Sequence, residues 1–287
     1  MGVSATLWGF RFGRAIVPRL PAGLEGQLAV AVGTLAWLLN ASAARVVRGN
    51  LRVVLGREPR AAEVRSVFLT AAQNYFDLLY LPRLSRSELT ARVHVDGWNH
   101  LDQALALGHG AVLASLHLGN VEIVASVAVA RGLEVMLPVE PVEPPALLGL
   151  MLSLRREAGL ICQPVGQDAF ATVRAALHRN AVVGIGADRI TLGSGDVVTL
   201  CGRPTRMPIA AALLAHRCQA PLLPIGTTRL AGHRFAVQIG APIPLSQTGV
   251  RRQDLRVTTQ RLFDSLESFL RCNPTQWVVF RPIWEEL

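Results

Sequence analysis

The chain has 287 residues, of which 51% are hydrophobic and 17% charged, a balance that excludes a disordered chain and supplies enough apolar residues for a well-filled core. Its 29 basic and 20 acidic residues give a net charge of +9, which favours an anionic partner such as nucleic acid, a phosphorylated ligand or an acidic membrane surface. The basic residues are scattered arginines, with no lysine, no interleaved aromatic residues and no zinc-finger spacing. Nucleic acid is therefore the least favoured of these partners.

The length allows either one large α/β domain or a core with a helical appendage. Four cysteines show no C-x-x-C spacing and are expected to be free, buried thiols in a reducing cytoplasm; they are Cys162, Cys201, Cys218 and Cys272.

The first forty residues mix large apolar residues with arginines. Residues 5–17 contain Trp8 and Phe12 beside Arg11 and Arg14, and residues 28–39 form an apolar run. This run is shorter than the roughly 20 residues needed to span a bilayer. Two interpretations stay open: an amphipathic segment lying in the membrane interface, or helices packed on the core of the protein itself.

From residue 43 to residue 89 the apolar spacing predicts helices, and residues 93–97 alternate like an edge strand. Residues 111–116 then form an apolar run short enough for a buried strand, which stops at His117. A turn at Gly119 and Asn120 leads into a second apolar pattern of helical type.

His117 and Glu122 are the most chemically suggestive residues of this stretch. With His117 at the end of a strand, Glu122 is expected in the first turn of the following helix, where negative charge is favoured. From there its carboxylate is predicted to bond one imidazole nitrogen and leave the other free to accept a proton. The alternative is a histidine at the mouth of a loop, beside a glutamate that only caps the helix.

The segments that follow alternate between strand and helix. A helix over residues 124–130 and a buried strand over 133–138 complete a βαβ unit, which predicts a parallel sheet with a ligand site beyond the carboxyl ends of its strands. Another buried strand over 181–187 ends at Asp188 and Arg189. The remaining expected elements are a flexible loop at 191–195, a strand at 197–200, a turn at 201–204 leading to a helix at 208–218, paired strands at 221–225 and 235–239, and a long helix at 255–270.

The segment from His117 to Glu122, His-Leu-Gly-Asn-Val-Glu, resembles the H-x-x-x-x-D/E signature of the bacterial lipid A biosynthesis acyltransferases and the mycobacterial phosphatidylinositol mannoside acyltransferases, within the lysophospholipid acyltransferase superfamily. Further stretches agree in order along nearly the whole chain: Arg48–Leu51, Val139–Pro141, Arg155–Gly159, Ala187–Arg189, Gly202 with Met207 and Pro208, Leu213–Ala215 before Ala220 and Pro221, and Pro274–Trp277.

The resemblance implies a mixed, largely parallel sheet flanked by helices, as in glycerol-3-phosphate acyltransferase, with residues 1–42 as a membrane-associating helical segment and 43–287 as the acyltransferase domain. It implies transfer of an acyl group from acyl-CoA or acyl carrier protein to a hydroxyl of a glycolipid, on the cytoplasmic face of the cell membrane. His117 is expected to be the general base. The other implied site residues are Glu122 and Asp188 as catalytic groups, and Arg155, Arg189, Glu140, Asn120 and Arg156 as substrate-binding groups, with either Arg155 or Arg156 facing inward.

No metal ion and no cofactor apart from the acyl donor are expected. Lipid A enzymes usually begin with a membrane-spanning helix, which this sequence is not expected to form, so the mannoside acyltransferases are the closer resemblance. The acceptor is left open between lipids like phosphatidylinositol mannoside and lipids like lipid A.

Other classes of protein fit less well. A serine hydrolase would need the G-x-S-x-G elbow, which the sequence lacks, and the dinucleotide fingerprint beginning at Gly184 and Gly186 has Arg189 in place of its third glycine. The remaining alternative is a catalytically inactive peripheral membrane protein of the same fold that binds lipid.

Overall fold

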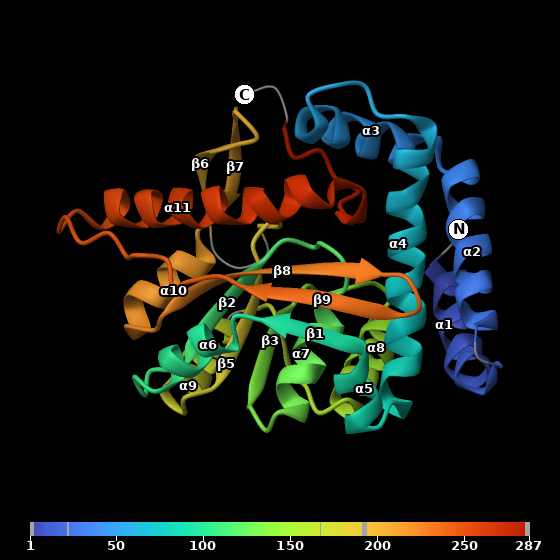
Figure 1. Ribbon diagram of the computed structural model, residues 1–287, viewed down its shortest axis with the longest axis horizontal. Helices are drawn as coiled ribbons and strands as arrows, with labels where there is room; N and C mark the ends of the chain where they lie inside the picture. The colour runs from blue at the N-terminus through green and yellow to red at the C-terminus, as the bar shows by residue number, and fades with distance from the viewer. Residues whose placement is uncertain (1–2, 22, 167, 191–193, 285–287) are drawn as a thin grey trace.

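The structure, a computed structural model, describes residues 3–21, 23–166, 168–190 and 194–284. These residues form a seven-stranded sheet with helices on both faces and a separate two-stranded sheet (Figure 1). The strands are β1 (Val93–Asp96), β2 (Ala111–Ser115), β3 (Val135–Val139), β4 (Ile161–Pro164), β5 (Val182–Gly186), β6 (Gly195–Leu200), β7 (Arg203–Pro208), β8 (Leu222–Leu230) and β9 (Arg234–Ile239).

The large sheet has the strand order β1-β9-β8-β2-β5-β3-β4. Its five strands from β8 to β4 are parallel, whereas β9 is antiparallel to β8 and β1 is parallel to β9. The sheet is therefore mixed and largely parallel, as predicted, and β1 lies at its edge. The predicted pairing of the strands near residues 221–225 and 235–239 is also present, as β8 and β9.

The helices are α1 (Val3–Ile16), α2 (Leu24–Leu39), α3 (Ala41–Leu55), α4 (Ala61–Tyr80), α5 (Arg86–Arg92), α6 (Trp98–Leu105), α7 (Val121–Ala130), α8 (Pro145–Glu157), α9 (Ala169–His178), α10 (Ala210–Cys218) and α11 (Arg251–Cys272), with short 3₁₀ turns η1 (Val17–Arg19), η2 (Leu81–Arg83) and η3 (Pro274–Gln276). In Figure 1, α11 crosses the sheet above β8 and β9, and α4 stands between the sheet and the N-terminal helices α1 and α2.

Alternating side chains of the central strands supply two hydrophobic cores. Val112 of β2 and Val183 of β5 point to one face, where they join α9, α10 and α11. Leu113 and Val182 point to the opposite face and pack with residues of α6 and α7, because successive strand residues face opposite sides. Each fully buried aliphatic side chain contributes about 1.5–3 kcal/mol, so the buried strands anchor the segments that follow them.

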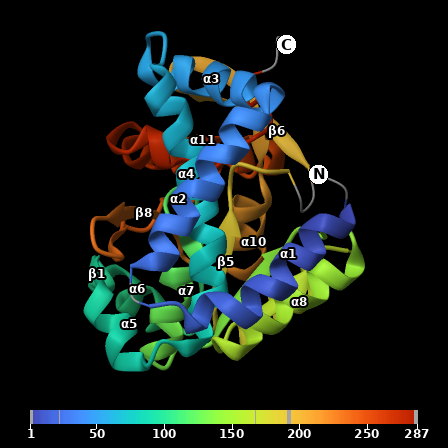
Figure 2. The same ribbon diagram turned by 90° about the vertical axis from the view of Figure 1, so that its right-hand side faces the viewer.

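The helices α1 and α2 pack on the rest of the protein along one side only. α2 lies against α4, where a Cβ at Gly33 would come within 2.9 Å of the Leu69 backbone, and α1 runs beside α8 (Figure 2). Among the described residues, no single helix has the length and hydropathy of a membrane span; α2 and α3, bent by 97° relative to each other, meet that test only as a pair.

One predicted element differs from the structure. Residues 203–208 form β7, which pairs antiparallel with β6 around a turn at Cys201 and Gly202, and the helix α10 begins only at Ala210. Thr205 and Met207 are buried whereas Arg206 is exposed, which is the period-two pattern of a strand. Of the predicted loop at 191–195, residues 191–193 lie outside the described part of the chain.

Candidate active site

His117 and Asp188 lie side by side because their strands are neighbours. Ser115 at the end of β2 is in register with Gly186 at the end of β5, so the residues two positions beyond each strand meet at the carboxyl edge of the sheet. Nδ1 of His117 lies 2.5 Å from Oδ1 of Asp188. The backbone N–H of His117 also donates to Oδ2 of Asp188 at 2.8 Å.

The Asp188 carboxylate is fully buried and accepts a third hydrogen bond, from Nε1 of Trp277 at 2.7 Å. Burial alone would raise the pKa of Asp188, but the attraction of the His117 ring and the hydrogen bonds from His117 and Trp277 lower it to about 2. Asp188 is therefore an anion at neutral pH. An anion bonded to Nδ1 fixes the orientation of the ring and stabilises an imidazolium.

The structure corrects the prediction that Glu122 bonds the His117 ring. Glu122 is in the first turn of α7, as expected, but its carboxylate pairs with Arg155 of α8, which contacts it through Nη2 and donates from Nε at 3.1 Å. The carboxylate that bonds the ring, at Nδ1, is that of Asp188. Both members of the Glu122–Arg155 pair are largely buried, at 18% and 13% side-chain exposure.

Burial raises the pKa of Glu122, whereas the Arg155 guanidinium lowers it, and the net shift is downward. The same pairing raises the pKa of Arg155 against the effect of burial. Arg155 lines the cavity described below, whereas Arg156 is exposed and does not line it. The prediction that Arg156 binds substrate is not supported by this placement.

Asn120 caps the start of α7 and does not contact the cavity described below. Its side-chain oxygen accepts hydrogen bonds from the backbone N–H groups of Glu122 and Ile123 at the start of α7, and its amide donates to Asp77 at 2.7 Å. Asn120 is 1% exposed and does not line the cavity. The prediction that it binds substrate is therefore replaced by a capping role.

The preceding residue, Gly119, cannot be replaced by a larger residue unless the backbone of the turn or of β8 moves. Its φ of +62° is in the left-handed region, and a Cβ would lie 2.5 Å from the carbonyl oxygen of Thr227. Glycine at this position thus lets the turn after His117 pass close to β8.

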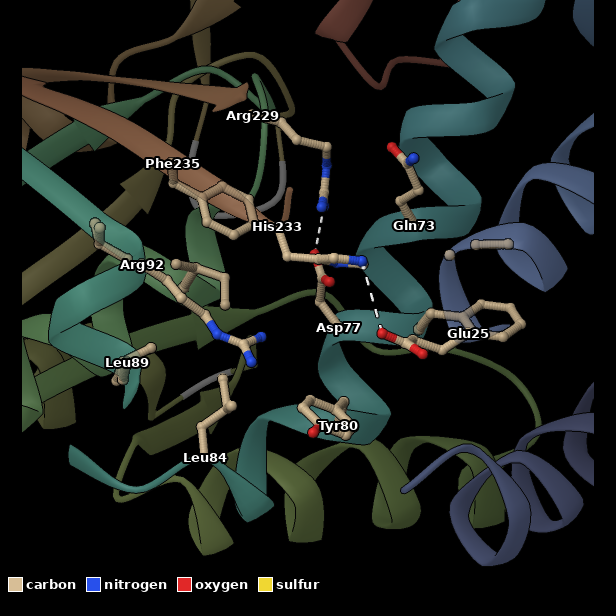
Figure 3. A pocket seen from close by; sticks show the side chains of 15 residues that line it. Glu25, Gln73, Asp77, Tyr80, Leu84, Leu89, Arg92, Arg229, His233 and Phe235 are labelled. Carbon is tan, nitrogen blue, oxygen red and sulfur yellow. Dashed lines mark hydrogen bonds and ion pairs between the residues drawn. The ribbon is translucent and has the colours of Figure 1, made fainter. Parts of the chain in front are cut away.

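Several residues that hold this turn were not identified from the sequence. Asn74 of α4 donates to the carbonyl of Gly119 at 2.6 Å, and Asp77, one helical turn further on, pairs with Arg229 of β8 (Figure 3). Gln276 bonds both backbone groups of Arg229. The i, i+3 spacing of Asn74 and Asp77 places them on one helix face, which is the only sequence signal that could have linked them.

Figure 3 also shows the small cavity beside Arg229, lined by Glu25, Gln73, Tyr80 and Arg92 among others. Its volume is about 30 Å³, which is room for one or two water molecules. It is too small for an acyl chain or a sugar.

A much larger cavity, of about 330 Å³, opens beside His117 and Glu122, and this volume is in the range of ligand-binding pockets. Its interior is apolar, with Leu113 of β2, Leu137 of β3 and Val124 of α7 among its walls. Two glycines of β5, Gly184 and Gly186, also line the cavity and let neighbouring side chains approach the strand closely. A Cβ at Gly184 would come within 2.6 Å of the Leu137 side chain, and one at Gly186 within 2.8 Å of the His117 ring.

Charged residues lie at the same cavity. Arg189 and Glu140, both predicted as site residues, line it and approach each other to 3.6 Å. Glu140 also accepts a hydrogen bond from Arg281 at 3.2 Å. Among the residues that the structure describes, no cluster of three or more His, Cys, Asp or Glu side chains has an arrangement that could hold a metal ion.

The ring of His117 lines the cavity, and its Nε2 makes no hydrogen bond within the described part of the chain. A ring held at Nδ1 by a buried carboxylate, with the other nitrogen open to a cavity, can accept a proton from a bound hydroxyl. His117 and Asp188 lie at the carboxyl ends of neighbouring parallel strands, where open α/β sheets bind their ligands. The fold and this pair together are typical of an enzyme.

The chain belongs to the bacterial lipid A biosynthesis acyltransferase family, whose model matches residues 3–286, and it is an acyltransferase. It is 28% identical over 246 residues to the phosphatidylinositol mannoside acyltransferase of Mycobacterium tuberculosis (strain H37Rv), a match that covers 83% of this chain and 76% of the relative. The enzyme of that name from Mycolicibacterium smegmatis is 25% identical over 244 residues, covering 83% of this chain and 78% of the relative.

Proposed function

We propose that the protein moves a fatty acyl group from a thioester, acyl-CoA or acyl carrier protein, to a hydroxyl of a membrane glycolipid, with His117 as the general base. The observation that carries this proposal is the His117–Asp188 pair at the mouth of a large apolar cavity, in a chain of an acyltransferase family.

The chemistry follows from the position of the ring. Nε2 of His117 takes the proton of the acceptor hydroxyl while the hydroxyl oxygen attacks the thioester carbonyl, and Asp188 stabilises the imidazolium that forms. The tetrahedral intermediate then collapses, its C–S bond breaks, and the thiolate receives the proton from Nε2. Positive groups near the cavity, Arg155 and Arg189, favour the developing oxyanion.

The apolar part of the cavity is suited to the acyl chain. Side chains at alternate positions of β2 and β5 face it, and two of these positions on β5 are Gly186 and Gly184. This wall of the cavity, which we call the trough, runs from Gly186 beside the His117 ring past Gly184 to Val182. An acyl chain lying in this trough has its carbonyl beside the ring.

The rim of the cavity carries an excess of positive charge. Arg189 and Arg281 share the single carboxylate of Glu140, and two cations beside one anion favour a phosphate-bearing donor. Both acyl-CoA and the phosphopantetheine arm of an acyl carrier protein have that chemistry.

An apolar outer surface on α1 and α2 supports membrane association. We call the residues of this surface the N-terminal apolar face: Trp8, Phe12, Ile16, Leu28, Val32, Leu35, Leu38 and Leu39, all between 38% and 75% exposed. On the inner side of α1, Phe10 packs edge-on against Tyr75, which lines the cavity. A protein lying on the cytoplasmic face of the cell membrane through this surface would take its lipid acceptor from beside the cavity.

The acceptor proposed first is a glycolipid like phosphatidylinositol mannoside, because the curated relatives carry that name at 25–28% identity. An acceptor like lipid A is the second candidate, and the name of the family supports it.

The test is a transfer assay with the purified full chain, a labelled palmitoyl thioester and vesicles containing one acceptor at a time. CoA and acyl carrier protein thioesters are compared as donors, and products are identified by mass spectrometry. We expect an acylated glycolipid from the mannoside vesicles. Hydrolysis of the thioester without any acylated lipid, from every donor and acceptor, would contradict the proposal.

A further inference from the structure

Trp277 contacts the catalytic pair without contacting the cavity. It is 2% exposed, and its indole Nε1 donates to Oδ2 of Asp188 at 2.7 Å. It does not line the large cavity. Any influence of this side chain on the reaction therefore passes through Asp188.

The backbone around Trp277 also holds the turn that carries the base. Trp277 pairs with Leu118 in a single antiparallel β-bridge. The N–H of Val278 donates to the carbonyl of His117 at 2.8 Å, and the N–H of Gly119 donates to the carbonyl of Gln276 at 3.1 Å. The segment 276–278 thus holds the turn through hydrogen bonds of its main chain, and it holds the Asp188 carboxylate through the indole of Trp277.

The two oxygens of Asp188 have different partners. Oδ1 faces the ring of His117, whereas Oδ2 accepts from the His117 backbone and from the Trp277 indole. Without the indole, Oδ2 keeps one donor in a site that excludes water. The carboxylate then loses a charge-assisted bond that determines which way its plane faces.

We propose that Trp277 is a positioning residue for acyl transfer: its indole N–H fixes the Asp188 carboxylate in the orientation that bonds Nδ1 of His117. This inference rests on the proposed role of His117 as the base. It assigns a function to a tryptophan that lies 89 positions away in the chain from the carboxylate it orients.

The chain supplies a matched control in Trp284. Its ring packs edge-on against Trp277 at a centroid distance of 6.0 Å, and its Nε1 is buried without a hydrogen-bond partner among the described residues. Replacing either indole removes a similar apolar ring and one N–H. Only the replacement at Trp277 removes a bond to Asp188.

The experiment compares Trp277→Phe with Trp284→Phe, and also places 3-benzothienylalanine, which has sulfur instead of the indole N–H, at each position. We expect both variants at position 277 to lower kcat about 10- to 100-fold, the value of a hydrogen bond to a charged group, with KM unchanged. We also expect the downfield proton resonance of His117 Nδ1–H to shift upfield or broaden. Variants at position 284 are expected to keep both kcat and the resonance.

The benzothienyl variant decides the question if Trp277→Phe does not fold, because it preserves the shape of the ring. Equal losses at positions 277 and 284, or an unchanged kcat and resonance in the folded benzothienyl variant at 277, would overturn the inference. A wild-type protein without transfer activity would contradict the proposed function instead, and the resonance would still report whether Trp277 orders the His117–Asp188 bond.

Discussion

Oδ1 of Asp188 lies 2.5 Å from Nδ1 of His117, and the carboxylate that makes this contact has no exposed surface. The pair joins two segments 71 residues apart in the chain, which meet because β2 and β5 are adjacent and in register at Ser115 and Gly186. The geometry of this pair is thus a direct product of the strand order of the sheet.

Asp188 also predicts a dependence of stability on pH. Its pKa falls from an ordinary value of 3.8 to about 2 in the folded protein, so its contribution is fully present above pH 3.8 and is lost as the pH falls towards 2. The total is about 2 kcal/mol, of which about half is lost between pH 6 and pH 3.

Urea unfolding of the wild type and Asp188→Asn over pH 3–6 measures this contribution. The free energy of unfolding of the wild type is expected to fall by about 1 kcal/mol more than that of the variant over this range. Parallel curves for the two proteins would show that Asp188 is not stabilised as an anion.

The buried Glu122–Arg155 pair predicts a strong coupling between these residues. Glu122→Gln leaves Arg155 as an uncompensated charge, and Arg155→Met does the same to Glu122, so each single change is expected to cost about 3–5 kcal/mol of stability. The double variant Glu122→Gln/Arg155→Met leaves no isolated charge and is expected to lose less than the sum.

A double-mutant cycle by chemical denaturation provides the measurement. The exposed pair of Arg131 and Asp102, at 39% and 50% side-chain exposure, is the control and is expected to couple by no more than about 1 kcal/mol. Equal coupling in the two pairs would be incompatible with the buried position of Glu122.

Gly184 predicts a change in acyl-chain preference. It lies two residues before Gly186, the residue beside the His117 ring, which is about 7 Å at strand spacing, or roughly five carbons of an extended chain with bonds of about 1.5 Å. Gly184→Val places a side chain against Leu137 and obstructs the trough at that depth.

Transfer rates with a series of acyl-CoA lengths test this prediction. Gly184→Val is expected to lower kcat/KM for long chains while sparing chains shorter than about five carbons. The control is Gly149→Val, because Gly149 lies on α8 with open space around it. An equal loss for every chain length would mean that the acyl chain lies elsewhere.

The N-terminal apolar face predicts binding to lipid vesicles. The pairs Trp8→Ser/Phe12→Ser and Leu35→Ser/Leu38→Ser are each expected to weaken binding to anionic vesicles at least about tenfold, because they remove exposed apolar surface that would be buried in lipid. Deletion of residues 1–40 is expected to abolish binding.

Co-sedimentation with vesicles, with and without anionic lipid, measures this binding. Leu107→Ser/Val250→Ser is the control pair, since both residues are about as exposed but lie outside α1 and α2, at 63% and 57%. An equal effect of the control pair and the N-terminal pairs would contradict a specific membrane face.

The strands and their carboxyl-end residues could be predicted from the sequence, because a buried parallel strand is a continuous apolar run that ends at its first charged or polar residue. His117 and Asp188 both follow such runs. Their direct contact could not be predicted, since local patterns do not reveal which parallel strands are adjacent. The prediction that Glu122 bonds the ring assumed that the carboxylate nearest in sequence is also nearest in space.

The remaining differences have similar physical causes. Asn120 precedes a helix, where its side chain is used in capping, and this function left it unavailable to the cavity. The strand β7 was missed because its first two residues were predicted as part of a turn, and Pro204 and Pro208 hide its alternation until the partner strand β6 is known. Trp277 reaches Asp188 only through tertiary folding of the C-terminal segment.

The role of His117 as the general base is tested most directly by the transfer rate of His117→Ala with saturating palmitoyl thioester and glycolipid vesicles. His109→Ala is the control, because His109 is exposed and lies outside the cavity. We expect kcat to fall about 10²- to 10⁴-fold in His117→Ala, the contribution of a general base, and His109→Ala to keep the wild-type rate. Unchanged turnover in a folded His117→Ala protein would contradict this role.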